Sequence, residues 1–136
     1  MIHTIRKQLY ERSLGLLLIR LGVGLVFLMH GIMKLQNLAG INSFFVHLGL
    51  PAPIALLIAL LETIGGIALI FGIFTRVFAL LLGIEMIVAI FITNPTLSGG
   101  WQQHELEALL MAVSFGLVYL GSGKWSLWHW DPKIDR

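Results

Sequence analysis

The chain has 136 residues, of which 57% are hydrophobic and only 12% are charged, and its mean hydropathy is +0.90. A soluble domain carries roughly twice that charged fraction, so the composition predicts an integral membrane protein. The net charge of +2 lies mostly in the tails, where it indicates orientation and not nucleic-acid binding. The chain has no cysteine, which excludes disulfides and thiolate catalysis by its own residues but not redox chemistry by a bound cofactor.

Four apolar segments are expected to span the membrane, at about residues 14–35, 54–74, 77–93 and 105–120. The first is long enough, at 1.5 Å per residue, to cross a hydrocarbon core of about 30 Å. No signal peptide is expected, because no small-residue cleavage site follows this run. Residues 1–136 are therefore predicted to form a single integral membrane domain.

The connection between the first two spans has an amphipathic middle, INSFFVHLG, followed by LPAP. This pattern predicts a short helix in the membrane interface that ends at Gly49 and Pro51. The second and third spans are joined at Thr75–Arg76 by a tight turn and should form an antiparallel hairpin. The predicted fold class is all-α, a transmembrane four-helix up-down bundle with one short interfacial helix.

The distribution of basic residues predicts the orientation. Both tails and the turn at Arg76 are positive, whereas the loop at 94–104 has no lysine or arginine. We therefore expect both termini to be cytoplasmic, in a bacterial-type inner membrane. Trp125, Trp128 and Trp130 follow the last span, where indole rings favour the headgroup level.

The stretch RLGVGLVFLMHGIMK places Arg20, His30 and Lys34 inside the first span. A charge near the bilayer centre costs about 2.5–3.5 kcal/mol on insertion scales, so such a residue needs a partner or a function. At about 100° per residue, Arg20, Phe27 and Lys34 share one helix face, with His30 at its edge.

Two carboxylates lie at similar depth in the next spans, Glu62 in LLETIGG and Glu85 in LGIEMIV, each about 12 Å from the outer boundary. We predict that Lys34 pairs with Glu62, and that His30, Lys34, Glu62 and Glu85 converge on a ligand-binding pocket with walls such as Phe27 and Met86. The competing interpretation is that these charges hold helices together.

Arg20 and Glu105 are additional candidates for the same pocket. Arg20 lies deeper, toward the cytoplasm, where it either reaches Glu85, snorkels to the interface or joins two helices. Glu105 and Glu107 open the fourth span, and a carboxylate at a helix start is favourable without any ligand.

The sequence gives no support for a metal site. His30 and the glutamates are ligands that suit iron or manganese, but no span carries two ligands one turn apart. Haem is less favoured than a quinone as a cofactor, because haem needs an axial ligand and His30 is the only well-placed histidine.

Taken together, RLGVGLVFLMHGIMKL, FFVHLGLPAP, LLETIGGIALIFGIFTR and GSGKWSLW resemble the DoxX family of small four-helix membrane proteins. The resemblance covers roughly residues 14–128. It implies a membrane subunit linked to a thiosulfate:quinone oxidoreductase or to redox complexes that respond to oxidative or thiol stress. The residues that it carries over are His30, Gly31, Lys34, Glu62, Gly65, Gly66, Thr75 and Arg76.

Three functions remain open from the sequence. The leading one is a membrane subunit of a redox system whose polar pocket binds a quinone or another small ligand beside a redox partner protein. The second is a non-catalytic scaffold that stabilises a partner complex, and the third is a small proton-coupled transporter. Lipid is an expected partner in each case, and whether the chain forms a homo-oligomer is left open.

Overall fold

The computed structural model describes residues 2–93 and 100–128, and within them the chain is entirely helical, without strands. The helices are α1 (Ile2–Gln36), α2 (Leu38–His47), α3 (Pro53–Phe71), α4 (Thr75–Thr93), the short 3-10 helix η1 (Trp101–Gln103) and α5 (Glu105–Leu120). The predicted all-α class is confirmed. Trp130 and most of the loop at 94–104 lie outside the described residues.

Three of these helices are long and apolar enough to cross a membrane: Tyr10–Gln36 within α1, Pro53–Phe71 and Thr75–Thr93. The fourth expected span falls on α5, which has 16 residues and is about 24 Å long, shorter than the hydrocarbon core. The helix predicted between the first two spans is present as α2. The crossing of the membrane by all four segments, as an up-down bundle, stays a prediction.

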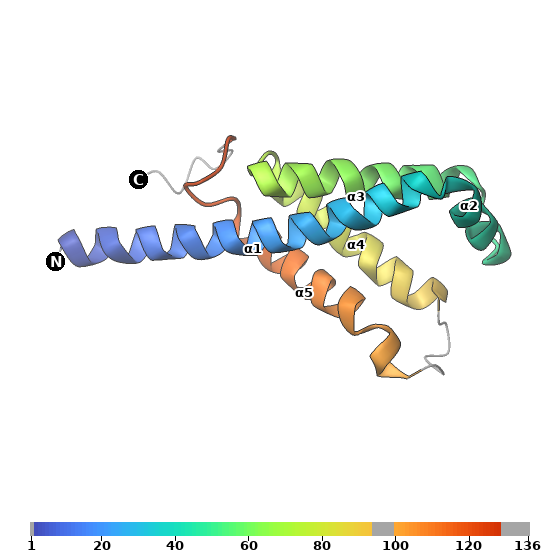
Figure 1. Ribbon diagram of the computed structural model, residues 1–136. Coiled ribbons are helices and arrows are strands. Elements are labelled where there is room, and N and C mark those ends of the chain that lie inside the picture. Colours follow the sequence, from blue (N-terminus) through green and yellow to red (C-terminus); the bar gives the residue numbers. More distant parts are fainter. Residues whose placement is uncertain (1, 94–99, 129–136) are drawn as a thin grey trace.

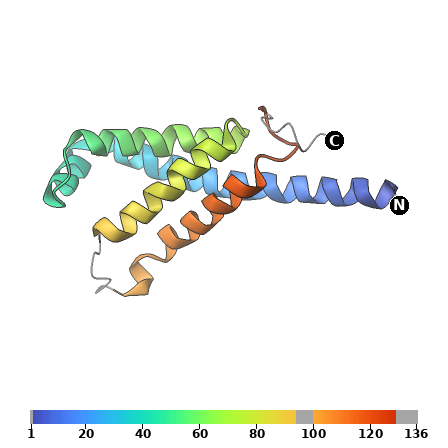
Figure 2. The same cartoon turned by 180° about the vertical axis from the view of Figure 1, so that it is seen from behind.

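The long helices associate as two pairs, which both views of the ribbon show (Figures 1 and 2). Helix α1 lies beside α3, and α4 lies beside α5. The two pairs lie closest where α3 turns into α4, and they diverge toward the end that carries α2 (Figure 1). The predicted hairpin of α3 and α4 is therefore joined by a tight turn but opens along its length.

Glycines explain why α1 and α3 pack so closely. A Cβ atom added at Gly66 would lie 2.5 Å from the backbone nitrogen of Leu28, and one at Gly24 would lie 2.8 Å from the carbonyl oxygen of Gly66. Only the absence of a side chain lets these backbones approach, as at small-residue interfaces in membranes. Farther along the same seam, Gly31 faces Thr63 and Ala59.

The core lies where the two pairs meet. Phe27, Leu69, Leu82 and Leu117 come from α1, α3, α4 and α5 and are at most 1% exposed. Gly72 ends α3 in the left-handed conformation, with φ of 70°, and allows the chain to reverse into α4. This solid end of the molecule leaves the diverging end, beneath α2, as the place for a cavity.

Candidate functional site

Three charged side chains from three helices meet at the diverging end. The Nζ atom of Lys34 on α1 lies 2.7 Å from Oε2 of Glu62 on α3 and 3.9 Å from Oε1 of Glu85 on α4. The side chains of Glu62 and Glu85 are only 2% and 7% exposed, whereas that of Lys34 is 25% exposed. The expected pairing of Lys34 with Glu62 is therefore present, with Glu85 as a second, more distant partner of the same ammonium.

The hydrogen bonds of this cluster are incomplete. Oε2 of Glu62 and Oε2 of Glu85 are buried and have no hydrogen-bond partner, so the short contact to Lys34 is an ion pair rather than a well-aligned hydrogen bond. One ammonium also faces two carboxyl groups. Buried polar groups in a finished packing interface are normally satisfied, so atoms left open in this way call for an explanation.

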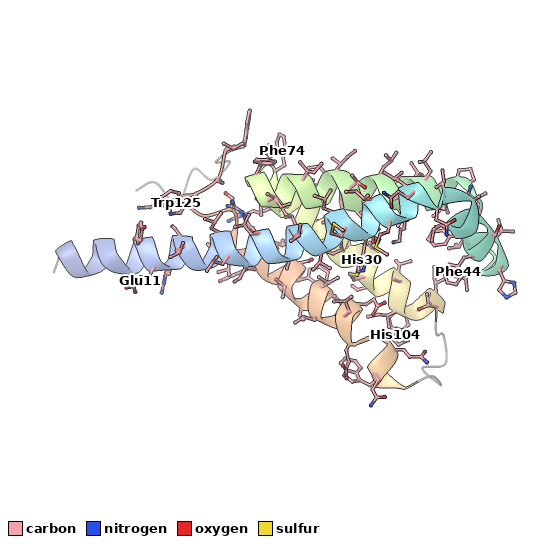
Figure 3. The ribbon with its side chains drawn as sticks, in the orientation of Figure 1. Glu11, His30, Phe44, Phe74, His104 and Trp125 are labelled. Carbon is pink, nitrogen blue, oxygen red and sulfur yellow. The ribbon has the colours of Figure 1, made fainter. Side chains whose placement is uncertain are left out.

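The explanation lies beside them, in a cavity of about 310 Å³ between the two helix pairs. Its polar lining consists of His30, Lys34, Glu62, Glu85, Glu107 and Thr93. The apolar lining comes from α2 through Phe44 and Phe45, from α3 through Ile58, from α4 through Met86 and Ala89, and from α5 through Leu110. Figure 3 shows that His30 and Phe44 lie toward the α2 end of the molecule, whereas Phe74 and Trp125 lie at the opposite end. The cavity thus has charged groups and extensive apolar walls, as small-molecule sites do.

The four residues predicted as ligand-binding all line this cavity: His30, Lys34, Glu62 and Glu85. Of the two expected wall residues, Met86 also lines it. Phe27 does not, because it is fully buried in the core between the helices. That the cavity binds a ligand stays a prediction.

Glu105, the additional candidate on α5, is exposed and does not line the cavity, whereas Glu107 does. Positions two apart on a helix differ by about 200°, so the two carboxyl groups point to opposite sides. Helical spacing indicates which of the two carboxyl groups faces inward. Glu107 stands three and seven positions before Leu110 and Ser114 and so shares their helix face, which the structure shows to be buried. Oε2 of Glu107 is also buried and without a hydrogen-bond partner.

Helix α2 contributes a wall that the sequence analysis did not assign to the pocket. Its residues Ile41, Phe44 and Phe45, and Leu48 directly after it, line the cavity. Their spacing of three and four positions gives one apolar face, the same pattern that predicted an interfacial helix. The pattern alone does not distinguish a face that meets lipid from one that closes a cavity.

Arg20 lies outside the cavity and is 0% exposed. Its Nε donates to the carbonyl oxygen of Leu69 at 3.0 Å, and its Nη2 donates to those of Ile70 at 3.4 Å and Trp125 at 2.7 Å. Its Nη1 donates to the carbonyl oxygen of Ser122. The guanidinium therefore joins the last turn of α3 to the segment after α5.

This position suits a cation. The last carbonyl groups of a helix have no partner in the helix and carry its negative dipole end, so they attract Arg20 without any carboxylate. The same chain segment is held by the backbone nitrogen of Leu127, which donates to the carbonyl oxygen of Phe71 at 3.0 Å. Of the roles considered for Arg20, the contacts show the joining of helical segments and neither a contact with Glu85 nor snorkelling.

No three histidine, aspartate or glutamate side chains within residues 2–93 and 100–128 are placed to hold a metal ion together. What the arrangement offers instead is a set of carboxylate acceptors, one ammonium and one imidazole beside apolar walls. Such groups can bind a polar head group and exchange protons with it.

Comparison with known proteins identifies the chain's relatives. The DoxX family model matches residues 15–95. "Putative oxidoreductase CatD" of Bacillus subtilis is 37% identical over 124 residues, covering 91% of this chain and 90% of that protein. "Uncharacterized membrane protein Rv3486" of Mycobacterium tuberculosis is 32% identical over 133 residues, covering 87% of this chain and 80% of that protein. No solved structure matches. The chain is therefore an integral membrane protein that belongs to the DoxX family.

Proposed function

We propose that this DoxX-family protein binds a small, largely apolar molecule in the cavity between its helix pairs, as a subunit of a membrane redox system. The leading ligand is a quinone. The observation that carries the proposal is the cavity of about 310 Å³ with Lys34, Glu62 and Glu85 at its edge. The relative from Bacillus subtilis, which is named as an oxidoreductase, supports the redox context.

The open hydrogen bonds favour a ligand over a purely structural role. If the charges only joined helices, each would be saturated by another helix, as Arg20 is by four carbonyl groups. Instead, the buried Oε2 of Glu85 has neither a hydrogen bond nor an ion pair beside free volume, and Oε2 of Glu62 has only its ion pair with Lys34. A bound head group would complete them.

The roles follow from the chemistry of the side chains. Lys34 and His30 are placed to donate hydrogen bonds to a ligand oxygen, and Glu62 or Glu85 is placed to exchange a proton with it. The chain has no cysteine, so thiol chemistry belongs to a redox partner protein. In this proposal, binding and proton exchange belong to this chain and the remaining steps to its partner.

The proposal includes a topology in which α1, α3, α4 and α5 cross the inner membrane in alternating directions, with both termini in the cytoplasm. With this topology, the end where the helix pairs diverge faces outward (Figure 1), so the cavity is expected in the outer half of the bilayer. Reporter fusions after residue 136 and near residue 99 test this arrangement. They should give a cytoplasmic and an external signal respectively, and the reverse pattern would move the cavity to the cytoplasmic half.

The binding proposal is tested by filling the cavity without touching its charges. Ala89 lines the cavity, so Ala89→Phe should reduce the copurified quinone, measured by mass spectrometry, and the affinity for a short-chain quinone by about tenfold or more. Ala112 on α5 is exposed and lines no part of the cavity, so Ala112→Phe is the matched control. Equal quinone binding by both variants would contradict the proposed site. If the unmodified protein binds no quinone at all, the scaffold interpretation takes precedence.

A further inference from the structure

We infer that the pocket selects head groups that donate hydrogen bonds, so that of a quinone couple it binds the hydroxyl-bearing hydroquinone in preference to the quinone. This inference rests on the proposed function and specifies the ligand class of the same site. The donors and acceptors that line the cavity differ in number and in how many of them are already paired.

The lining offers few donors. The ammonium of Lys34 lies 2.7 Å from Glu62, a contact that engages one of its three N–H groups, and 3.9 Å from Glu85, which is beyond hydrogen-bond distance. The hydroxyl of Thr93 donates to the carbonyl oxygen of Ala89 at 2.7 Å, within its own helix. The donors left to a ligand among the described lining side chains are therefore His30 and the remaining N–H groups of Lys34.

Acceptors are in excess. Glu62, Glu85 and Glu107 bring three carboxyl groups to the lining, and Oε2 of Glu85 and of Glu107 are buried with neither a hydrogen bond nor an ion pair, whereas Oε2 of Glu62 has the ion pair with Lys34. Glu62 and Glu85 as whole residues are only 1% and 8% exposed, so water does not readily solvate them. A buried carboxyl oxygen without a partner is satisfied by a hydrogen-bond donor and not by another acceptor.

The two forms of a quinone differ in this property. A quinone carbonyl only accepts, so it can pair with Lys34 or His30 but leaves the open oxygens of Glu85 and Glu107 without a donor. A hydroquinone hydroxyl donates, and an O–H to carboxylate bond is short and about twice as strong as a neutral one. A site built to pair with a hydroxyl discriminates strongly against an analogue that lacks it, because its buried polar groups are left unpaired.

A protonated amine also donates hydrogen bonds, so it must be separated from a hydroxyl by experiment. We assign the hydroxyl because the walls contributed by Phe44, Phe45 and Met86 suit the faces and edges of a ring. The amine then becomes one arm of the test.

The test measures dissociation constants by isothermal titration calorimetry for the full-length protein in lipid nanodiscs under anaerobic conditions. Four probes are compared: trimethylhydroquinone, trimethyl-1,4-benzoquinone, the dimethyl ether of the hydroquinone, and hexylammonium. The ether keeps the ring but has no donor. We expect the hydroquinone to bind at least about tenfold more tightly than either the quinone or the ether.

The variants link this preference to the carboxylates. Glu85→Gln keeps the side-chain volume but replaces an acceptor oxygen by a donating amide, so it should reduce the preference for the hydroquinone to less than about threefold. Glu105→Gln is the matched control, because Glu105 is exposed and outside the cavity lining, and it should leave the preference unchanged.

The remaining outcomes are distinct. Equal or tighter binding of the quinone or the ether, lost in Ala89→Phe, would overturn the inference and leave the proposed function standing. A preference for hydroquinone that Glu85→Gln does not alter would also overturn it. Tighter binding of hexylammonium would replace the hydroxyl by a cationic head group. If none of the ring compounds shows binding that Ala89→Phe weakens, the proposed function itself is overturned.

Discussion

The two ends of this membrane protein each bury a cation of α1 but treat it differently. At one end Arg20 is fully buried and its guanidinium donates to carbonyl groups of α3 and of the segment after α5. At the other end Lys34 faces two carboxyl groups, and Oε2 of Glu85 is left without a partner beside a cavity. Burial alone therefore does not distinguish the two charged sites, whereas incomplete pairing beside free volume does.

The difference follows from how the helix pairs are arranged. They meet at the Arg20 end, where Gly72 brings the chain around and buried side chains form the core. They diverge at the Lys34 end, where α2 covers the gap with aromatic side chains. The same helices thus provide a rigid end, which fixes the geometry, and a hollow end, which has room for a ligand.

The largest expected effect is at the rigid end. Arg20→Met leaves the carbonyl groups of Leu69, Ser122 and Trp125 without their charged donor, so we expect a loss of about 3–5 kcal/mol of stability. Thermal unfolding in nanodiscs measures the loss, and limited proteolysis should show earlier release of the chain after α5. Arg12 on the same helix is exposed, so Arg12→Met should change neither result. Equal effects of the two variants would contradict the role of Arg20.

The next effect concerns the pairing at the hollow end. Lys34→Met leaves Glu62 and Glu85 without their ammonium and should cost about 2–3 kcal/mol, less than a fully buried pair because Lys34 is 25% exposed. Adding Glu62→Gln should recover part of this loss, so the two changes should be less than additive. Strict additivity of the losses in thermal stability would show that the two residues do not act as a pair.

A smaller effect is expected at the close approach of α1 and α3, which lies between the two cations along α1. Gly66→Ala places a methyl group 2.5 Å from the backbone nitrogen of Leu28, so the helices must separate, at about 1–3 kcal/mol. Gly22→Ala meets nothing within 4 Å and should be neutral or slightly stabilising. If both variants unfold at the same temperature, this glycine contact does not set the spacing of the pairs.

The helices and the composition of the pocket could be predicted from the sequence because both depend on local properties. Apolar runs mark helices directly, and counting residues from the ends of the runs places Glu62 and Glu85 at one depth. The side of a helix that each carboxyl group faces was harder to predict, because Glu105 and Glu107 both lie in the first turn of α5 and only Glu107 lines the cavity. Comparison with the buried Leu110 and Ser114 resolves that choice.

The partners of Arg20 and the divergence of the helix pairs could not be predicted, because they depend on contacts that do not require a particular residue type. Arg20 pairs with backbone carbonyl groups, one of which belongs to Ser122, 102 positions away, and any residue could supply such a carbonyl. The divergence of the helix pairs is similar. Glycines such as Gly24 and Gly66 indicate that two helices approach closely, but they do not specify how the remaining helices diverge.

The smallest expected effect gives the sharpest comparison, because it makes one chemical change at two neighbouring carboxyl groups. Lys34 lies 2.7 Å from Glu62 but 3.9 Å from Glu85, and attraction between charges falls with distance. Glu62→Gln should therefore lower stability by about 1–2 kcal/mol. Glu85→Gln should cost less than about 1 kcal/mol, since it also removes the repulsion between two carboxylates that share one ammonium.

Thermal unfolding of both variants in nanodiscs makes the measurement, with Glu105→Gln as an exposed reference. A larger loss for Glu85→Gln would identify Glu85 as the main partner of the ammonium and would reverse the assignment of the open acceptor. The expected order, combined with loss of the hydroquinone preference in Glu85→Gln, would show that Glu85 contributes little to stability and is retained for ligand selection. That outcome would distinguish the two ends: substitution of Arg20 at the rigid end lowers stability, whereas substitution of Glu85 at the hollow end affects mainly ligand binding.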